Sequence, residues 1–248
     1  MLTIVSDFDG TLCFDGRTVR DEIVEALVSV HREHRLVIAS ARPPRDLLPV
    51  LPEALQDVTV IGGNGAFVRP AGAGIDGIET VHFEAEVRAS IAALVEEFDL
   101  TSLVDGEWDY AYTGDGTDEV IAKVHTAGSA RNVVAAELAV WTKALLFTDD
   151  PIVVERLRRL PVVVNAHGTE AVVDVAPTGI TKAAAVARLG IDDFVAFGND
   201  QNDRSLFAAA RHSVCVGEHP VGELASERVA PDGVAEALLR VCELAPQL

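Results

Sequence analysis

The sequence predicts an α/β fold built on a parallel sheet, with a second α/β block inserted into it. Short apolar segments alternate with helical patterns at both ends of the chain, which is the rhythm of parallel strands joined by crossover helices. From about residue 80 to about residue 168 this rhythm gives way to a block of different pattern. We therefore expect one domain made of 1–79 and 169–248 and an inserted domain at 80–168.

In the first part of the chain the elements follow one another as strand, helix, strand, helix and strand. Ile23, Leu27 and Val30 recur at helical spacing, and Pro43 with Pro44 suits the start of a second helix. The glycine-rich GGNGAF leads into another strand-like piece, so it does not predict a dinucleotide-binding turn. The expected segments are strands at 3–6, 36–40 and 58–61, a helix at 19–34 and a helix from 44.

The insert and the last part of the chain are assigned in the same way. Apolar residues at helical spacing predict helices, and short runs rich in Val, Leu, Phe and Tyr predict strands. In the insert we expect helices at 87–98, 118–127 and 151–160 and strands within 103–116 and 141–148. After the insert we expect strands at 171–177, 194–198 and 213–217 and helices at 181–189, from 203, and at 234–244.

The charge balance is strongly acidic. The chain has 39 Asp and Glu against 20 Lys and Arg, a formal net charge of −19, which repels nucleic acid and anionic membrane surfaces. The three cysteines show no paired spacing, no apolar run is long enough to cross a bilayer, and the N-terminus does not look like a signal peptide. We expect a cytoplasmic protein that binds a small molecule and neither nucleic acid nor membrane.

The strongest chemical signal is the N-terminal stretch LTIVSDFDGTL. An apolar strand runs into Asp7 and Asp9, which lie on the same side if the extended geometry persists. Carboxylates that close repel each other unless a cation lies between them. Gly10 then ends the strand at its carboxyl end, where α/β sheets bind ligands. The stretch therefore predicts a metal, a phosphate or both.

Three further polar stretches fall at strand ends or helix starts of the same domain: SAR at 40–42, Lys182, and GNDQND at 198–203. Parallel strands would bring all four stretches to one edge of the sheet. A carboxylate such as Asp7 can attack phosphorus only when the phosphoryl charge is screened. Mg²⁺ held by Asp7 and the 199–203 loop, Lys182, and a hydrogen bond from Ser40 would supply that screening. Asp9 is placed to protonate the leaving oxygen.

Taken singly, these stretches have simpler explanations, since Ser40 and Asn202 fit helix caps and Lys182 fits a solvated helix residue. Their joint order favours chemistry. DFDGT, SAR, the Lys182 segment and GNDQND resemble the four motifs of the haloacid dehalogenase (HAD) superfamily of phosphatases. The insert, with GGNGA before it, is similar to the Cof-like type IIB branch. The resemblance covers nearly the whole chain and implies a Rossmann-like core with an inserted α/β cap of type C2.

The resemblance also implies roles for individual residues. It implies Asp7 as nucleophile, Asp9 as general acid and base, and Mg²⁺ as the cofactor. The implied metal ligands are the Asp7 carboxylate, the Asp9 backbone carbonyl and position 199, with Asp203 supporting the metal and Lys182. The residues expected at the phosphate are Phe8 through its backbone, Ser40, Ala41, Arg42, Lys182 and Asn202.

Two positions depart from the family pattern. The second motif reads Ser-Ala-Arg, where the branch usually has Thr-Gly-Arg; the hydroxyl group and Arg42 are kept. The fourth motif has Asn199 where an Asp is commoner. An amide is a weaker ligand than a carboxylate, which leaves Asn199, Asp200 and Asp203 as candidates to complete the metal site.

The function predicted from these residues is that of a Mg²⁺-dependent phosphatase of small phosphate monoesters. Sugar phosphates are the favoured class, by analogy with capped relatives. One alternative is a sugar phosphomutase of the same superfamily, which would need a bisphosphate activator. Another, from a different class, is a phospho-accepting signalling receiver, although receivers are shorter and carry no insert. The sequence predicts neither the physiological substrate nor the oligomeric state.

Overall fold

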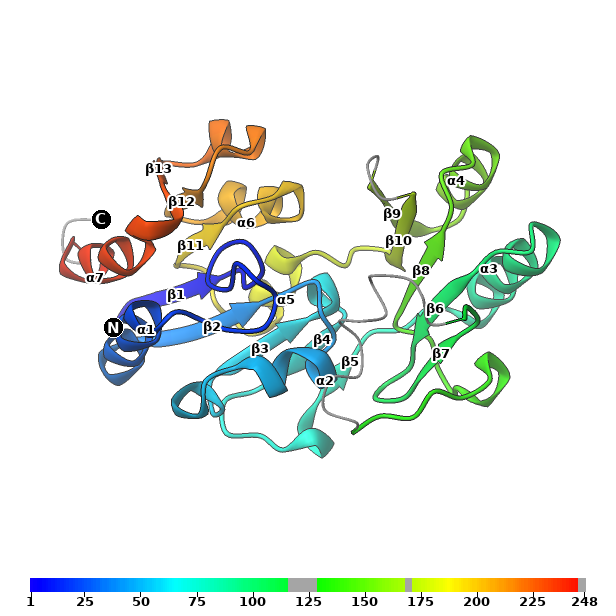
Figure 1. Cartoon of the computed structure of the whole chain (residues 1–248), viewed down its shortest axis with the longest axis horizontal. Helices are drawn as coiled ribbons and strands as arrows, with labels where there is room; N and C mark the ends of the chain where they lie inside the picture. The colour runs from blue at the N-terminus through cyan, green and yellow to red at the C-terminus, as the bar shows by residue number, and fades with distance from the viewer. Residues whose placement is uncertain (116–128, 168–170, 245–248) are drawn as a thin grey trace. The chain divides into compact units, whose positions relative to one another are not determined.

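The computed structural model describes residues 1–115, 129–167 and 171–244 (Figure 1). The chain forms two units, of which the larger consists of Met1–Glu79 and Thr181–Leu248 and the smaller of Thr80–Ile180. The larger unit is built on an eight-stranded sheet and the smaller on a five-stranded sheet. Helices accompany both sheets, so the predicted α/β class is confirmed.

The larger sheet has the strand order β13-β12-β11-β1-β2-β3-β4-β5. Neighbouring strands from β13 to β3 run parallel, and β4 pairs antiparallel with β3. The strands are β1 (Thr3–Ser6), β2 (Arg35–Ala39), β3 (Thr59–Gly62), β4 (Phe67–Arg69), β5 (Glu79–Thr80), β11 (Val195–Gly198), β12 (His212–Val216) and β13 (Glu227–Val229). Because β1 lies between β2 and β11, the polar stretches that follow these three strands leave the sheet side by side.

Helices cover both faces of this sheet. They are α1 (Asp21–Glu33), α2 (Pro44–Leu47), α5 (Lys182–Arg188), α6 (Arg204–Ala209) and α7 (Val234–Leu244). Successive strand residues point to opposite faces, so Ile4 packs in a core cluster with α1 and α7, and Val5 in another with α5 and α6. Burial on both faces explains why the central strands β1, β2, β3 and β11 are largely apolar. In Figure 1, α1 and α7 lie against each other.

Two helix starts carry polar groups to the strand ends. α5 begins at Lys182 because the side chain of Thr181 accepts the N–H of Ala184 (3.0 Å), which caps the helix. α6 is preceded by a 3₁₀ turn whose N-cap is Asp200, with a capping box closed by Asp203. Capping thus fixes where Lys182 and Asp203 emerge.

The smaller unit has an antiparallel sheet with the order β7-β6-β8-β10-β9. Its strands are β6 (Ser102–Asp105), β7 (Tyr110–Tyr112), β8 (Lys143–Phe147), β9 (Val162–His167) and β10 (Val172–Pro177), and its helices are α3 (Ala85–Glu97) and α4 (Pro151–Arg158). Val104, Ala144 and Val173 of the sheet share a core cluster with Ile91 of α3 and Leu157 of α4. Both helices therefore cover the same face of the sheet.

The predicted end of the insert is corrected by the structure. The sequence assigns 171–177 to the larger domain, but Val172–Pro177 forms β10, which pairs antiparallel with β8 and β9. The smaller unit therefore extends to Ile180 rather than to 168. β10 is buried along its whole length, and such an apolar run is also typical of a parallel strand. The helix predicted at 118–127 lies outside the described residues.

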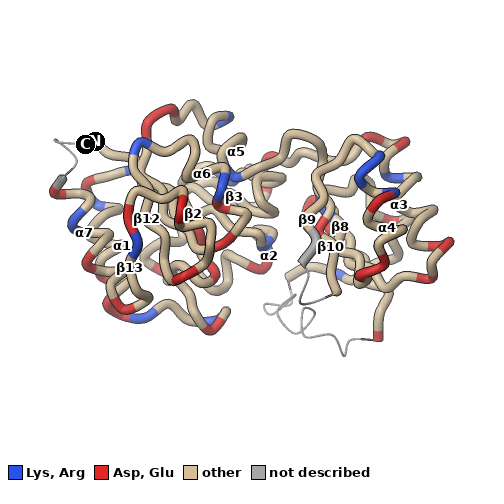
Figure 2. The backbone as a smooth tube through the Cα atoms, turned by 90° about the horizontal axis from the view of Figure 1, so that it is seen from above, with Lys and Arg blue, Asp and Glu red and all other residues tan. Residues whose placement is uncertain are grey.

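Asp and Glu residues are spread along the chain in both units (Figure 2), in keeping with the net charge of −19. The cysteines at 13, 215 and 242 are free thiols. Within the described part of the chain, no helix combines the length and the apolar character needed to span a bilayer.

Candidate active site

A buried charge cluster lies where β1 and β11 end. Lys182 Nζ donates to Asp7 Oδ1 (2.5 Å) and to Asp203 Oδ1 (2.7 Å), and all three side chains are buried. Asp7 directly follows β1, Asp203 lies in the turn after β11, and Lys182 is the first residue of α5. One ammonium group thus faces two carboxylates, so the cluster carries surplus negative charge when both acids are ionised.

Burial and the attraction between opposite charges act against each other in this cluster. Burial raises the pKa of Asp7 to about 7; the attraction of Lys182 opposes this rise and the repulsion of Asp203 adds to it. For Lys182, burial lowers the pKa, but the attraction of Asp203 and Asp7 outweighs it, and the net pKa is raised. Lys182 therefore stays protonated at neutral pH. A further positive charge close to Asp7 would favour its ionised form.

Asn199 brings a third polar group to Asp7. One end of its side-chain amide lies 3.0 Å from the Asp9 backbone oxygen and 3.1 Å from Asp7 Oδ2. With nitrogen at that end the amide donates to both; with oxygen there, three oxygen atoms face one another, which a bound cation would stabilise. Gly10 permits this approach, because a Cβ at its position (φ +77°) would collide with the Asn199 side chain.

The loop after β11 is held by Asp203. Its Oδ2 accepts the N–H groups of Asn199 (2.9 Å) and Asp200 (3.2 Å), while its Oδ1 accepts from Lys182. Gly198 leaves room for this contact, since a Cβ there would lie 2.5 Å from the Asp203 carboxyl carbon. Both oxygens of Asp203 are thus engaged in fixing Lys182 and the backbone at Asn199.

The turn after β1 is closed by the main chain of Phe8. Its carbonyl oxygen accepts the N–H groups of Leu12 and Cys13 (both 2.9 Å), and its side chain is buried in the core. Thr11 Oγ1 donates to Asp7 Oδ2 (2.9 Å). Thr11 is absent from the predicted site residues, although it belongs to the DFDGT motif that pointed to the site.

The residues after β2 take different positions from one another. Ser40 Oγ accepts the N–H of Arg42 (3.0 Å), so Ser40 shapes this turn, whereas the N-cap of α2 is Pro43. Ala41, between Ser40 and Arg42, is half-buried. Arg42 Nε donates to Asp9 Oδ2 (2.7 Å) and its Nη2 to Asp9 Oδ1 (2.5 Å). The sequence assigns Arg42 to the phosphate, and the structure places it on Asp9.

Asn64 is another residue that the sequence analysis missed. It lies in the turn after β3 with a left-handed backbone (φ 56°), and its Oδ1 accepts from Asn202 Nδ2 (3.2 Å). Its own N–H donates to the Ser40 carbonyl oxygen (2.9 Å). Asn64 thus links the segments that follow β2, β3 and β11. Its only signal in the sequence was an Asn between glycines at the end of a strand.

The groups around Asp7 fit a hard divalent cation. Across residues 1–115, 129–167 and 171–244, no three His, Cys, Asp or Glu side chains come together as a metal site. The Asn199 amide nevertheless lies about 3 Å from both the Asp7 carboxylate and the Asp9 carbonyl, and oxygen donors of these kinds suit Mg²⁺. The sharing of one ammonium group by two buried carboxylates points the same way.

Comparison with known proteins identifies the family and the fold of the chain. A family model described as haloacid dehalogenase-like hydrolase matches residues 4–222, while no curated protein matches the chain significantly. A haloacid dehalogenase-like hydrolase from Bacteroides thetaiotaomicron is 22% identical, with a TM-score of 0.81 over 97% of this chain and 99% of that one. A haloacid dehalogenase-like hydrolase from B. subtilis is 18% identical, with a TM-score of 0.80 over 96% of this chain and 99% of that one. A structure described as a HAD subclass IIB sugar phosphatase is 21% identical, with a TM-score of 0.79 over 98% of this chain and 99% of that one.

Proposed function

The chain belongs to the haloacid dehalogenase-like hydrolase family, and on that premise we propose that it is a Mg²⁺-dependent phosphatase of small phosphate monoesters. The proposed reaction is hydrolysis through an aspartyl-phosphate on Asp7. Sugar phosphates are the favoured substrates, because a structurally similar protein is described as a sugar phosphatase. The partner of the chain is then a small phosphate ester.

The observation that carries this proposal is the environment of the Asp7 carboxylate. Asp7 shares Lys182 with Asp203, and it lies against the Thr11 hydroxyl and the Asn199 amide. A purely structural buried acid is normally balanced by its own cation, since uncompensated buried charge is costly. Surplus negative charge at the carboxyl end of a central parallel strand instead supports a site for a metal and a phosphate.

The groups we assign to Mg²⁺ are the Asp7 carboxylate, the Asp9 backbone carbonyl and the Asn199 amide oxygen. When bound, the ion neutralises charge on the phosphoryl oxygens and so lets an anionic nucleophile approach. We assign Asp203 a supporting role instead of direct ligation, because its oxygens already accept from Lys182 and from the main chain after β11.

The chemical steps fall to Asp7 and Asp9. An Asp7 oxygen attacks phosphorus, the bond from phosphorus to the ester oxygen breaks, and Asp9 gives that oxygen its proton. In the second half of the reaction, Asp9 takes a proton from a water molecule whose oxygen attacks phosphorus, and the bond between phosphorus and the Asp7 oxygen breaks. Inorganic phosphate leaves, and both carboxyl groups return to their starting states. Lys182 keeps its proton throughout and holds Asp7 in place.

Except for Arg42, which binds Asp9, the remaining predicted residues surround the phosphoryl group in this proposal. The Ser40 hydroxyl accepts from the Arg42 N–H, so its own hydrogen can be donated to a phosphoryl oxygen. Asn202 is held by Asn64, which favours a fixed orientation toward the same group. The Phe8 and Ala41 main chain and the Lys182 ammonium complete the expected set.

Phosphate release across a panel of sugar, nucleotide and cofactor phosphates tests the proposal. With Mg²⁺ alone, we expect inorganic phosphate from at least one ester class, and none in excess chelator, because the clustered acids would otherwise repel the dianion. A requirement for a bisphosphate activator would favour a phosphomutase. Phosphate that stays on Asp7 for hours would favour a receiver. Turnover that persists in excess chelator would contradict the proposed mechanism.

A further inference from the structure

Arg42 binds both oxygens of the Asp9 carboxylate. Nε donates to Oδ2 (2.7 Å) and Nη2 to Oδ1 (2.5 Å). The Asp9 side chain is 41% exposed, whereas the Arg42 side chain is only 12% exposed. A bidentate guanidinium–carboxylate pair fixes the plane of the carboxylate as well as its position. Arg42 therefore orients a carboxylate that would otherwise rotate in solvent.

Arg42 is itself anchored by the turn that carries Asp9. Nη2 also donates to the Gly16 carbonyl oxygen (2.8 Å), and the guanidinium lies 5.7 Å from the centre of the Phe8 ring. Gly16 has a left-handed backbone (φ 73°), and a Cβ there would come within 3.3 Å of Nη2. The arginine thus ties the end of β2 to the segment between β1 and α1.

We propose that Arg42 is a positioning residue for Asp9 and not a ligand of the transferred phosphoryl group. This role rests on the proposed function, in which Asp9 exchanges a proton with the leaving oxygen. To reach a phosphoryl group, Arg42 would have to give up three hydrogen bonds and leave Asp9 without its guanidinium partner. Each carboxylate oxygen offers about two acceptor sites and the pair uses one, so Asp9 keeps a site for the exchanged proton.

The two roles differ in how they respond to the leaving group. An alkoxide must be protonated as it leaves, whereas a dinitrophenolate leaves without a proton. A residue that positions Asp9 therefore affects alkyl phosphates selectively. A residue that binds the phosphoryl group affects both ester classes alike. The parameter kcat/KM covers the steps up to departure of the leaving group, so it separates the two roles.

The test measures kcat/KM at saturating Mg²⁺ for an alkyl phosphate and for 2,4-dinitrophenyl phosphate. We expect Arg42→Gln to lose about 10²-fold on the alkyl ester and less than about threefold on the dinitrophenyl ester. Arg42→Lys keeps the charge without the planar fork, so it should resemble Arg42→Gln. The double variant with Asp9→Asn should match Asp9→Asn alone, because Arg42 acts through Asp9. Arg211→Gln, which removes an arginine paired with Asp193 (3.1 Å), is the matched control.

Equal losses on both esters, full rescue by Arg42→Lys, or a raised inhibition constant for inorganic phosphate would assign Arg42 to the phosphoryl group and overturn the proposal. If Arg42→Gln does not fold, Arg42→Lys decides by the same comparison of esters. If the wild-type protein hydrolyses neither ester with Mg²⁺, the proposed function itself fails and the positioning role falls with it.

Discussion

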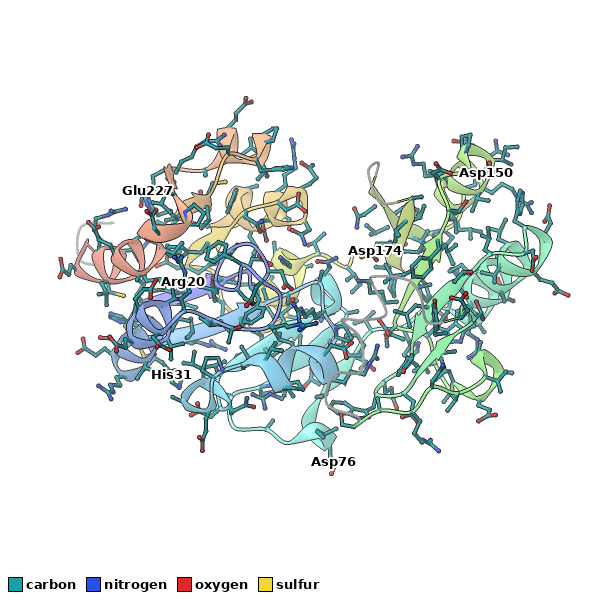
Figure 3. The ribbon with its side chains drawn as sticks, in the orientation of Figure 1. Arg20, His31, Asp76, Asp150, Asp174 and Glu227 are labelled. Atoms are coloured by element: carbon teal, nitrogen blue, oxygen red, sulfur yellow. The ribbon has the colours of Figure 1, made fainter. Side chains whose placement is uncertain are left out.

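Both units of the molecule bury a lysine, but in different structural contexts. In the larger unit, Lys182 opens α5 and reaches Asp7 and Asp203, which follow two parallel strands. In the smaller unit, Lys143 and Asp174 form a buried ion pair of 2.9 Å across the antiparallel strands β8 and β10; Asp174 is labelled in Figure 3. The first cluster joins residues at the ends of elements, and the second joins residues within a sheet.

The difference follows from sheet topology. Parallel strands joined by crossover helices bring all their carboxyl ends to one edge, so residues from distant parts of the sequence meet there without interrupting the sheet. A charged pair inside an antiparallel sheet occupies positions that would otherwise be apolar, and its loss is felt by the packing around it. We therefore expect charge substitutions at Lys182 and its partners to alter chemistry, and those at Lys143 and Asp174 to alter stability.

The largest expected difference between the two units is that between the effects of Asp7→Asn and Asp174→Asn. Asp7→Asn should lower kcat for phosphate release at least about 10⁴-fold, because a neutral amide is a poor nucleophile. Asp174→Asn should instead lower the free energy of unfolding by about 3 kcal/mol, because it takes a carboxylate from a buried ammonium group. Steady-state kinetics with an aryl phosphate and urea unfolding measure both. A folded Asp174→Asn protein without turnover would reverse the assignment.

The next prediction concerns substrate choice, which we assign to the smaller unit because the four motifs account only for the phosphate. Replacing Thr80–Ile180 with a short linker should reduce the differences in kcat/KM among sugar, nucleotide and cofactor phosphates by about 10²-fold, while some aryl phosphate hydrolysis remains. Cooperative urea unfolding of the truncated protein shows that the larger unit has folded. An unchanged order of preference in that folded protein would place specificity in the larger unit.

The sequence was most informative where the residues of a motif lie within a few positions of one another. Asp7, Asp9 and the GNDQND run were singled out from local patterns, because strand-to-loop transitions and the types of residue at them are visible in one dimension. Lys182 was singled out only by its order among the other stretches. The parallel order of the central strands made their convergence predictable. The confirmed α/β class and the gathering of these stretches at one edge follow from the same reasoning.

Contacts between side chains from distant segments, and the sheet to which a strand belongs, were not predictable in this way. Nothing local indicates that Arg42 pairs with Asp9, since the pair spans two loops. Likewise Asn64 reads as part of a turn until its contact with Asn202 is seen. β10 was placed in the wrong unit because a fully buried antiparallel strand and a parallel strand share one apolar pattern.

A smaller effect should appear in the pH dependence of stability. Burial raises the pKa of Asp7 from 3.8 to about 7, so the folded, metal-free protein retains a proton that the unfolded chain releases. The resulting stability is present below pH 4 and is lost as pH rises toward 7. We expect the free energy of unfolding in chelator to fall by about 2 kcal/mol between pH 5 and pH 8.

Asp7→Asn and Mg²⁺ provide the controls for this pH effect. The substitution removes the titrating group, so its stability curve should be flatter over the same range. Added Mg²⁺ should stabilise the wild-type protein at pH 8, because an ion that binds only the folded state shifts the equilibrium by mass action. A wild-type curve that rises between pH 5 and pH 8 in chelator would contradict the surplus of buried negative charge.

The smallest effect, and the most direct test of the metal ligands, concerns Asn199. Its amide lies 3.1 Å from Asp7 Oδ2 but brings no formal charge, so it should hold Mg²⁺ less tightly than a carboxylate would. At an effective dielectric near 20, a unit charge about 4 Å away is worth roughly 4 kcal/mol before desolvation. If only about 1 kcal/mol of this survives desolvation and repulsion from Asp7, the metal requirement changes about fivefold.

We therefore expect Asn199→Asp to lower the Mg²⁺ concentration for half-maximal activity about fivefold and Asn199→Ala to raise it by a similar factor. Metal titrations at constant ionic strength measure both shifts. Asp200→Asn tests the alternative ligand; we expect it to titrate like the wild-type protein, because Asp200 Oδ1 already accepts the N–H of Gln201 (2.6 Å) at the start of the next turn. If the Asn199 variants titrate like the wild-type protein while Asp200→Asn shifts, the third ligand is Asp200. The departure from the family pattern at position 199 would then be compensated by the next residue along the chain.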